Sequence, residues 1–476
     1  MSGDAIDIGS RRELMVDDHL IDSMTDGAEL RLHNPVERTT TFTCDRPWEG
    51  NWSGSPTMFQ DGDIYRMYYR GSTWPGVSVP YQFYLCYAES VDGISWTRPN
   101  LGLVEFDGST ENNILLRKNG AFEPFKDTNP DCPADQRYKA LTANGTLYAW
   151  ASPDGLRWSP MREEPVITLG KFDSQNVSFW DEVRQQYVVF YRAMRGPHDE
   201  LTDEGPQLGL DEHGPARDVM TCTSTDFLTW TEARWLQYPG APREQIYLNQ
   251  IRAYDRAPHL FVGFPGRFMA AREIEKGLPA TEHPAYDYAS ITETLFMSSR
   301  DGIHFKRWGE AFIRPGPRRE RWIYGATFPG YGLLTTPSAI DGMPDELSMY
   351  VNDGGGWSQR GTASRFRRYT MRSDGFVSMH APLSGGSLLS KPIIFDGSRL
   401  LMNYSTSAAG SIQVELQDAE GGVIPGFELS NEIYGDEIDE VITWQGGGDV
   451  RPLAGTPVRL RVVLQDGDLY SFRFAP

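Results

Sequence analysis

Four acidic residues of the sequence lie in polar segments beside predicted strands. They are Glu49 in RPWEGNW, Asp127 in PFKDTNP, Asp173 in GKFDSQN and Glu244 in PREQIYL. Two carboxyl groups perform general acid–base chemistry when one protonates a leaving oxygen and the other attacks a carbon atom or activates water. We therefore interpret these four as the candidate catalytic residues. Glu244, which precedes an aromatic segment, is the candidate proton donor.

Side chains that could bind a substrate stand close to these acids in the sequence. Amide groups donate and accept hydrogen bonds, and aromatic rings stack on apolar ligand faces. The candidate binding residues are Trp48, Trp52, Gln175, Asn176, Asn249, Arg321 and Trp322.

A turn phrase that recurs five times indicates which elements would position these residues. AESVDGISWT, ASPDGLRWSP, TSTDFLTWTE, SSRDGIHFKR and MRSDGFVSMH align on Asp92, Asp154, Asp226, Asp301 and Asp374, at steps of 62, 72, 75 and 73 residues. An Asp-Gly pair favours a tight turn, because glycine accepts positive φ and the carboxylate binds nearby backbone amides. Four copies carry an aromatic residue four positions later. Such regular spacing predicts a structural repeat rather than unrelated hairpins.

Between the turns, short segments rich in β-branched and aromatic residues predict strands at 63–71, 186–194, 259–268 and 346–354. No long segment shows an amphipathic helical pattern. A unit of this length suits one four-stranded blade with its loops. The sequence therefore predicts an all-β fold with a five-bladed β-propeller, in which polar residues of successive blades converge on a central funnel.

The repeat ends before the C-terminus, which predicts a second domain. We expect the propeller in residues 1–382 and a β-sandwich in residues 383–476, where short apolar and polar alternations are separated by Gly and Asp turns. The sandwich is either a structural wedge or a carbohydrate-binding module. Residues 12–24, RELMVDDHLIDSM, are predicted to form an early strand that closes the propeller ring.

The repeat and the appended β segment resemble the five-bladed propeller glycosidases, the clan of glycoside hydrolase families 32 and 43. RELMVDDHLID, RPWEGNW, FDSQNVSFWD, AFIRPGP and LMNYSTSAAGSIQVELQD are most similar to bacterial family-32-like proteins of undefined activity, over nearly the whole chain. The resemblance implies a glycoside hydrolase that uses carboxylates in the propeller funnel. A funnel admits a chain end most readily, so we expect cleavage of a terminal bond. Furanosides, such as fructosides or arabinosides, are the substrates that the resemblance favours.

The chain departs from the family pattern at two of its acids. Family 32 has a nucleophilic aspartate in a W-x-N-D-P-N-G motif where this sequence has Glu49, and an acid/base glutamate where it has Asp173. Asp127 lies in a setting similar to the R-D-P stretch, whose aspartate binds sugar hydroxyls and stabilises the transition state. The resemblance therefore implies that Glu49, Asp127 and Asp173 lie in the active site, but it does not determine which residue is the general acid.

Two other functions stay open at this stage. A non-catalytic glycan-binding propeller is one, because a fold does not determine a function. A sialidase-like hydrolase is the other, because the turns are similar to the Asp-box S-x-D-x-G-x-T-W, although the sequence does not assemble the arginine triad and Tyr/Glu pair of sialidases.

Composition bears on partners and location. A net charge of −20 with no basic stripe excludes nucleic acid as an expected partner, and no apolar run approaches the length of a membrane span. The N-terminus lacks an apolar signal region, so we expect a cytoplasmic protein, with a trimmed secreted form as the alternative. Single cysteines and scattered histidines predict no metal site and no cofactor. The sequence does not indicate an oligomeric state.

Overall fold

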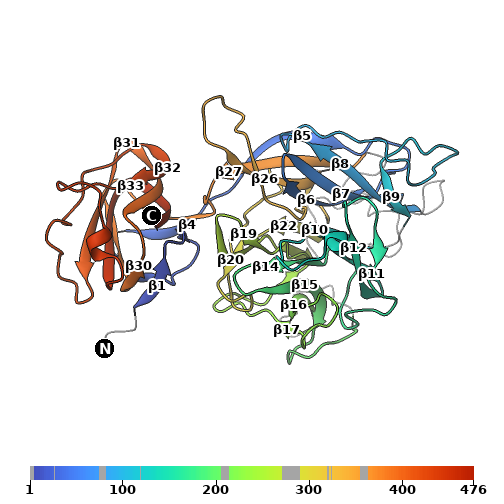
Figure 1. Cartoon of the computed structure of the whole chain (residues 1–476), viewed down its shortest axis with the longest axis horizontal. Helices are drawn as coiled ribbons and strands as arrows, with labels where there is room; N and C mark the ends of the chain where they lie inside the picture. The colour runs from blue at the N-terminus through green and yellow to red at the C-terminus, as the bar shows by residue number, and fades with distance from the viewer. Residues whose placement is uncertain are drawn as a thin grey trace. The chain divides into compact units, whose positions relative to one another are not determined.

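The computed structural model describes residues 5–25, 27–73, 82–117, 120–204, 214–270, 290–318, 321–322, 324–353 and 363–476 (Figure 1). These ranges contain strands and short 3₁₀ turns such as Ala134–Gln136 and Arg451–Leu453, and no α-helix. No helix within them is long and apolar enough to cross a membrane. The all-β prediction is confirmed.

The chain forms two compact units. One comprises Met1–Asn34, Asp255–Ala257 and Arg372–Pro476, and the other comprises Pro35–Tyr254 and Pro258–Met371. The second unit carries the candidate catalytic residues.

Five four-stranded sheets lie in the described part of this second unit. The first three are β6 (Gly54–Asp61), β7 (Ile64–Thr73), β8 (Gln82–Ser90) and β9 (Ile114–Arg117); β10 (Phe122–Lys126), β11 (Tyr138–Asn144), β12 (Thr146–Ser152) and β13 (Ser159–Pro160); and β14 (Val177–Asp181), β15 (Gln186–Arg195), β16 (Ala216–Ser224) and β17 (Arg234–Trp235). The fourth is β19 (Arg252–Tyr254), β20 (Ala257–Gly263), β23 (Met297–Ser299) and β24 (Phe305–Arg307), and the fifth is β25 (Leu334–Thr336), β26 (Glu346–Asp353), β27 (Arg365–Arg372) and β5 (Val36–Thr43). A smaller sheet joins β18 (Gln245–Ile246), β21 (Gly266–Ala270) and β22 (Ser290–Thr294).

The fifth sheet takes its outer strand from the N-terminal side of the chain. β5 pairs antiparallel with β27, with Thr43 opposite Arg365 and Val36 opposite Thr370. The prediction that residues 12–24 close the ring is therefore corrected, because β5 occupies this place. Residues 12–24 lie instead in the other unit, where Leu14, Met15 and Leu20 are buried.

Aromatic contacts join each of the first four sheets to a neighbour. The ring centroids of Tyr69 and Phe366, in the first and fifth sheets, are 6.0 Å apart. Phe125 of the second sheet lies 5.6 Å from Phe227, in the turn after β16. Phe190 and Phe261, in the third and fourth sheets, are 6.1 Å apart. Such face-to-face packing of successive sheets is consistent with a β-propeller.

Four of the five repeated turns have the same hydrogen bonds. In the first, Ser90 Oγ donates to Asp92 Oδ1 at 2.8 Å, and the N–H groups of Ile94 and Ser95 donate to the same oxygen at 2.7 Å. The turns at Asp154, Asp226 and Asp301 repeat this pattern. Each of the four follows the third strand of its sheet and leads towards the outermost one.

The fifth copy of the phrase has a different structure. The first four copies have serine two positions before the aspartate, but the fifth has Arg372 there. The Asp374 carboxylate is fully buried and accepts hydrogen bonds from Asn403 and Ser471, at 3.1 and 2.7 Å. The turn connects β27 to β28, which lies in the sheet of the other unit. The fifth copy is thus a connection between sheets and not a blade turn.

The other unit contains one ten-stranded sheet in its described part. Its strands are β1 (Ile6–Gly9), β2 (Glu13–Leu14), β3 (Ile21–Thr25), β4 (Glu29–Leu32), β28 (Val377–Ala381), β29 (Gly386–Ser390), β30 (Ile393–Phe395), β31 (Arg399–Asp418), β32 (Asp436–Val441) and β33 (Val458–Ala475). β31 and β33 pair along most of their lengths and share an apolar core that includes Trp444. The predicted sandwich and its boundary at residue 383 stay predictions.

We expect replacement of one turn aspartate to destabilise the protein. Asp154→Ala removes the acceptor of the Leu156 and Arg157 N–H groups, so the free energy of unfolding should fall by about 1–3 kcal/mol. Thermal denaturation followed by circular dichroism measures the change. The exposed Asp135→Ala is the matched control, and equal stability of the two variants would contradict this role for the turn.

Candidate active site

A pocket lies among the first three sheets of the larger unit. Its lining includes Ser55, Arg70, Glu123, Asp173, Ser174 and Gln175. These residues come from β6, β7, β10 and the segment that enters β14. The pocket therefore brings together two of the residues predicted from the sequence, Asp173 and Gln175, with an acid that the sequence analysis did not select, Glu123.

Asp173 presents its carboxylate to solvent at this pocket. Its side chain is 74% exposed, whereas Arg192, which donates a hydrogen bond to it, is only 6% exposed. The guanidinium carbon of Arg192 also lies 4.6 Å from the ring centroid of Tyr247. A buried arginine thus holds an accessible carboxylate in place.

Glu123 is the second acid of the pocket, and its environment is the opposite of that of Asp173. The residue is 2% exposed, and burial raises its pKa to about 8, although the Asn176 N–H, which donates to Oε2 at 3.1 Å, and the charge of Arg70 act against this shift. At neutral pH Glu123 is therefore a protonated carboxylic acid. The pocket contains one proton donor and one exposed carboxylate.

Gln175 links this pocket by hydrogen bonds to β6 and to Gln250. Its side-chain amide donates to Pro56 O and Thr57 Oγ1, both at 3.3 Å, and accepts a hydrogen bond of 2.6 Å from Gln250. Gln250 also donates to Pro329 O at 2.7 Å. Polar groups of four sheets or their entry segments meet here.

The backbone near these hydrogen bonds adopts uncommon conformations. Ser55, Gln250 and Thr327 have φ angles of 52°, 46° and 62°, in a region that residues other than glycine rarely occupy. Such residues often cluster at functional sites, where the surrounding structure maintains the strain.

Asn176 and Asn249, two further predicted binding residues, stabilise the entry segments of their strands. Asn176 Nδ2 donates to Phe172 O and Ser174 O, at 3.1 and 2.8 Å. Asn249 donates to Phe190 O and accepts from the Ile251 N–H. Both are at least 98% buried, so they position neighbouring residues rather than present amide groups to a ligand.

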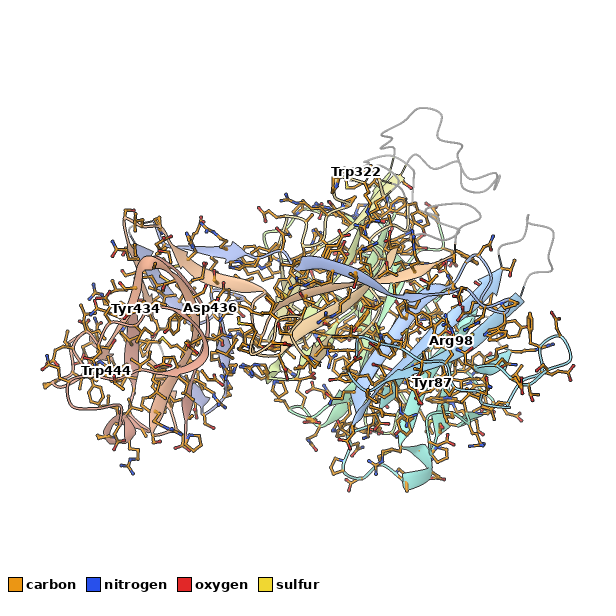
Figure 2. All side chains as sticks on the ribbon, turned by 90° about the horizontal axis from the view of Figure 1, so that it is seen from above. Tyr87, Arg98, Trp322, Tyr434, Asp436 and Trp444 are labelled. Carbon is orange, nitrogen blue, oxygen red and sulfur yellow. The ribbon has the colours of Figure 1, made fainter. Side chains whose placement is uncertain are left out.

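Glu49 does not line this pocket. It is fully buried and bound by Arg98 Nε at 2.8 Å, by the Tyr69 hydroxyl at 2.5 Å and by the Arg46 N–H at 2.9 Å. Figure 2 labels Arg98. These partners occupy both carboxylate oxygens, so Glu49 acts as a structural ion-pair partner in the first sheet.

The two tryptophans beside Glu49 differ in their surroundings. Trp48 donates to Asn113 Oδ1 at 2.8 Å and packs against Phe106, away from the pocket lining. Trp52 packs against Arg70, whose guanidinium carbon lies 4.4 Å from the ring centroid. Since Arg70 lines the pocket, Trp52 is the tryptophan that the structure brings to its edge.

Asp127 also lies outside the pocket lining. It follows β10 instead of preceding it, and its carboxylate is buried against Lys139 and the hydroxyl of Tyr187, the latter at 2.7 Å. The Asn129 N–H donates to its other oxygen at 2.9 Å. Asp127 therefore forms a buried ion pair within the second sheet, and its hydrogen bond from Tyr187 links that sheet to the third.

Glu244 lies at a separate pocket, which shares no lining residue with the first. Its carboxylate accepts hydrogen bonds from Arg267, at 3.0 Å, and from Arg307. Two guanidinium groups therefore surround the residue that the sequence presented as the proton donor. The geometry does not bring Glu244 together with Asp173.

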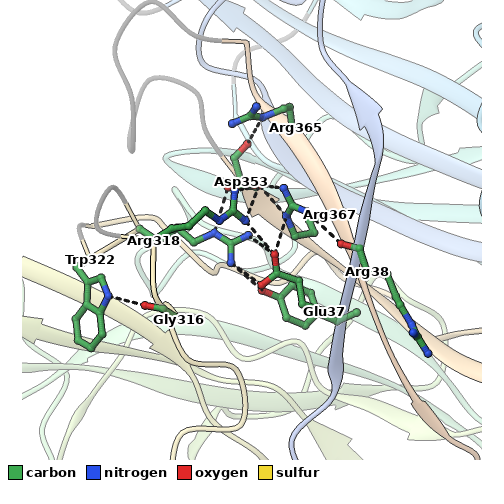
Figure 3. Close-up of polar contacts among 10 residues, drawn as sticks. Glu37, Arg38, Gly316, Arg318, Trp322, Asp353, Arg365 and Arg367 are labelled. Atoms are coloured by element: carbon green, nitrogen blue, oxygen red, sulfur yellow. Dashed lines mark hydrogen bonds and ion pairs between the residues drawn. The ribbon is translucent and has the colours of Figure 1, made fainter.

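Arg321 and Trp322 lie in the segment between β24 and β25, and Figure 3 shows contacts of this segment with the fifth sheet. Arg321 donates to Glu37 Oε2 at 2.9 Å and to Asp353 Oδ1 at 3.3 Å. Burial alone would raise the pKa of Asp353, but its arginine partners lower it to about 2. Trp322 donates to Gly316 O at 2.8 Å. Arg321 thus fastens β5, which carries Glu37, to the rest of the sheet.

No group of three or more His, Cys, Asp or Glu side chains in the described ranges could hold a metal ion. The four cysteines are buried free thiols. Burial raises the pKa of Cys44, Cys86, Cys132 and Cys222, which keeps them protonated.

Comparisons with known proteins give structural likenesses only. No family model and no curated protein matches the chain, so the resemblance to family 32 stays an expectation. One solved glycoside hydrolase is similar over 72% of this chain and 94% of its own chain, with 16% sequence identity and a TM-score of 0.43. A second solved glycoside hydrolase is similar over 92% of this chain and 100% of its own chain, with 9% sequence identity and a TM-score of 0.42. An N-acetylgalactosamine deacetylase from F. plautii, in complex with blood group B trisaccharide, is similar over 72% and 96%, at 12% identity and a TM-score of 0.44. Such low TM-scores do not establish the activity of this chain.

Sequence inspection could have found two of the three missed residues, Arg70 and Arg192. Arg70 and Arg192 end the similar phrases MYYR and VFYR in β7 and β15, and a repeated aromatic-Tyr-Arg phrase marks equivalent strand ends. Glu123 is the one charged residue of the apolar segment AFEPF. Its burial depends on the packing of other sheets, which no local pattern shows.

We expect Asp127→Asn to destabilise the fold. The variant leaves Lys139, whose side chain is 2% exposed, without its carboxylate, and breaking a buried pair costs about 3–5 kcal/mol. Chemical denaturation measures the loss, with the exposed Asp131→Asn as the control. Normal stability together with complete loss of enzymatic turnover would instead restore Asp127 as a catalytic candidate.

Proposed function

We propose that the protein is a glycoside hydrolase that cleaves a terminal glycosidic bond of an oligosaccharide in the Asp173–Glu123 pocket. The five four-stranded sheets are, in this proposal, the blades of one propeller ring, and the pocket opens into its funnel. Fructosides and arabinosides lead the substrate panel because the sequence resemblance implies them. No pocket residue distinguishes a furanose from a pyranose ring.

One observation carries this proposal: two carboxyl groups in opposite states line the same pocket. Glu123 is protonated at neutral pH because burial raises its pKa to about 8, whereas Asp173 is an exposed carboxylate held by Arg192. Pairs of titratable groups with contrasting environments are the usual signature of an acid and its partner base or nucleophile.

The two acids take complementary roles in the reaction. Glu123 donates its proton to the glycosidic oxygen as the bond to the anomeric carbon breaks. Asp173 either attacks the anomeric carbon or removes a proton from the attacking water, and Arg192 keeps its carboxylate in position. Trp52 packs against the guanidinium of Arg70, so in this proposal it helps to position Arg70 in the pocket lining.

We expect Asp173→Asn and Glu123→Gln each to lower kcat/KM by about 100-fold to 10,000-fold on an oligosaccharide that the wild-type protein cleaves. Product chromatography measures turnover across fructans, arabinans, xylans and sialosides. Glu123→Gln should retain far more activity on aryl glycosides with good leaving groups, which need no proton. Asp131→Asn is the control.

A wild-type protein that binds these sugars but cleaves none of them would favour the non-catalytic glycan-binding alternative. Equal loss of activity by Glu123→Gln on aryl glycosides and oligosaccharides would remove Glu123 as the proton donor.

We expect the fall of kcat/KM at alkaline pH to reflect the ionisation of Glu123. Activity that needs its proton should fall as pH rises through about 8. Initial rates between pH 5 and 10 give kcat/KM, and this fall should be absent from the residual activity of Glu123→Gln. An unchanged fall in this variant would assign the ionisation to another group.

Glu123 should also make stability depend on pH. Its pKa is higher in the folded than in the unfolded protein, so the stabilisation is complete below the ordinary value of 4.5 and is lost as pH rises through about 8. Within this window the free energy of unfolding should decline by roughly 1.4 kcal/mol per pH unit. Urea denaturation at pH 5 to 8 measures the slope, which Glu123→Gln should flatten.

A further inference from the structure

One short segment of the chain reaches both acids of the candidate active site. Residues 172–176 lie directly before β14 and outside any strand. Asp173, near the start of this segment, presents its exposed carboxylate at the pocket. The backbone N–H of Asn176, at its end, donates to Glu123 Oε2 at 3.1 Å. The place of Asp173 and the environment of Glu123 therefore depend on the conformation of the same few residues.

The side chain of Asn176 holds this segment in its conformation. Nδ2 donates to Phe172 O at 3.1 Å and to Ser174 O at 2.8 Å, and these two carbonyl groups flank Asp173 in the chain. Asn176 is 0% exposed, so bulk water does not compete for the two bonds. Local bonds from a side chain to the backbone can fix a conformation that no strand ladder maintains. The segment is thus closed on itself by one buried amide.

Asn249 provides a comparison within the same unit, because it too is buried just before the first strand of a sheet. Its Nδ2 donates to Phe190 O at 3.3 Å, and its Oδ1 accepts from the Ile251 N–H at 3.1 Å. In Asn176, by contrast, Oδ1 is buried without a hydrogen-bond partner among the described residues. A buried carbonyl without a partner costs stability. Stability alone therefore does not explain an asparagine at position 176.

We propose that Asn176 is a positioning residue, whose side chain holds residues 172–176 so that Asp173 faces the pocket and the Asn176 N–H stays on Glu123. The Asn176 side chain does not belong to the pocket lining, so it acts through the backbone. This inference rests on the proposed function in taking Asp173 and Glu123 as the reacting acids. It adds a residue that controls both of them.

The Asn176 N–H opposes the effect of burial on Glu123. A donor stabilises the carboxylate form, so this N–H lowers the pKa that burial raises to about 8. The Phe122 N–H and the charge of Arg70 act in the same direction, and Asp173 is the other acid that lines the pocket. Phe122 and Arg70 belong to β10 and β7 and do not depend on the Asn176 side chain. If the segment relaxes, the pKa of Glu123 should therefore rise further.

The first experiment titrates Glu123 in the folded protein without a substrate. NMR of protein labelled with ¹³C at the glutamate carboxyl carbons follows the titrations between pH 5 and 10, and the signal that Glu123→Gln lacks is that of Glu123. We expect Asn176→Ala to move its midpoint to higher pH by about one pH unit, as the loss of one hydrogen bond to a charged group would. A midpoint that stays unchanged or falls in folded Asn176→Ala would overturn the proposal.

Asn249→Ala is the matched control, because it also removes a buried amide that bonds to the backbone. Its partners lie outside residues 172–176, so the midpoint of Glu123 should keep its wild-type value. Thermal denaturation of both variants verifies folding. Equal shifts in the two variants would indicate a general loosening of the unit and would contradict a specific role for Asn176.

Kinetic measurements test the effect on Asp173. On an oligosaccharide that the wild-type protein cleaves, Asn176→Ala should lower kcat/KM by about 10-fold to 100-fold, because a reacting group displaced by about 1 Å loses that much. The fall of kcat/KM at alkaline pH should move upward together with the midpoint of Glu123. A merely structural role would lower stability without moving this fall. Wild-type kcat/KM and an unchanged pH profile in folded Asn176→Ala would contradict the proposal.

Failure of this inference differs from failure of the proposed function. If the Glu123 midpoint rises in Asn176→Ala and no glycoside is cleaved, the hydrolase proposal fails and the link between Asn176 and Glu123 stands. If glycosides are cleaved with Glu123 as the acid, and Asn176→Ala changes neither the midpoint nor the rate, the hydrolase stands and the positioning role is refuted.

Discussion

The pairing of β5 with β27 is the constraint on which the rest of the larger unit depends. It joins segments far apart in the chain: Arg38 Nε donates to Thr370 Oγ1, 332 positions away, at 2.9 Å. Without β5 the fifth sheet would have three strands and an unpaired edge. Closing so long a loop costs conformational entropy, which the ladder and the ion pairs of Glu37 with Arg321 and Arg367 offset. The pairing fixes the first strand of this unit, β5, against its last strand, β27.

Buried acids in this unit divide into two groups by their partners. Glu49 and Asp127 each have a cation in direct contact, Arg98 and Lys139, which makes them structural links within or between sheets. Glu123 has the backbone N–H groups of Asn176 and Phe122 and the charge of Arg70, and desolvation outweighs them and keeps it protonated. Glu123 thus differs from Glu49 and Asp127 in its partners, because no cation contacts its carboxyl group in the described part of the unit.

Local patterns predicted the local structure well. Four turn phrases form the expected turns, because their serine and aspartate donate and accept within a few residues. The fifth was misassigned because a single change, Arg372 in place of serine, alters the turn. Asp173 and Gln175, which precede a clear strand pattern, line the pocket, and their roles there stay predictions. Glu123 and Arg192 were missed, and Glu49 and Asp127 were given catalytic roles, because the partners that decide their roles come from other strands or other sheets.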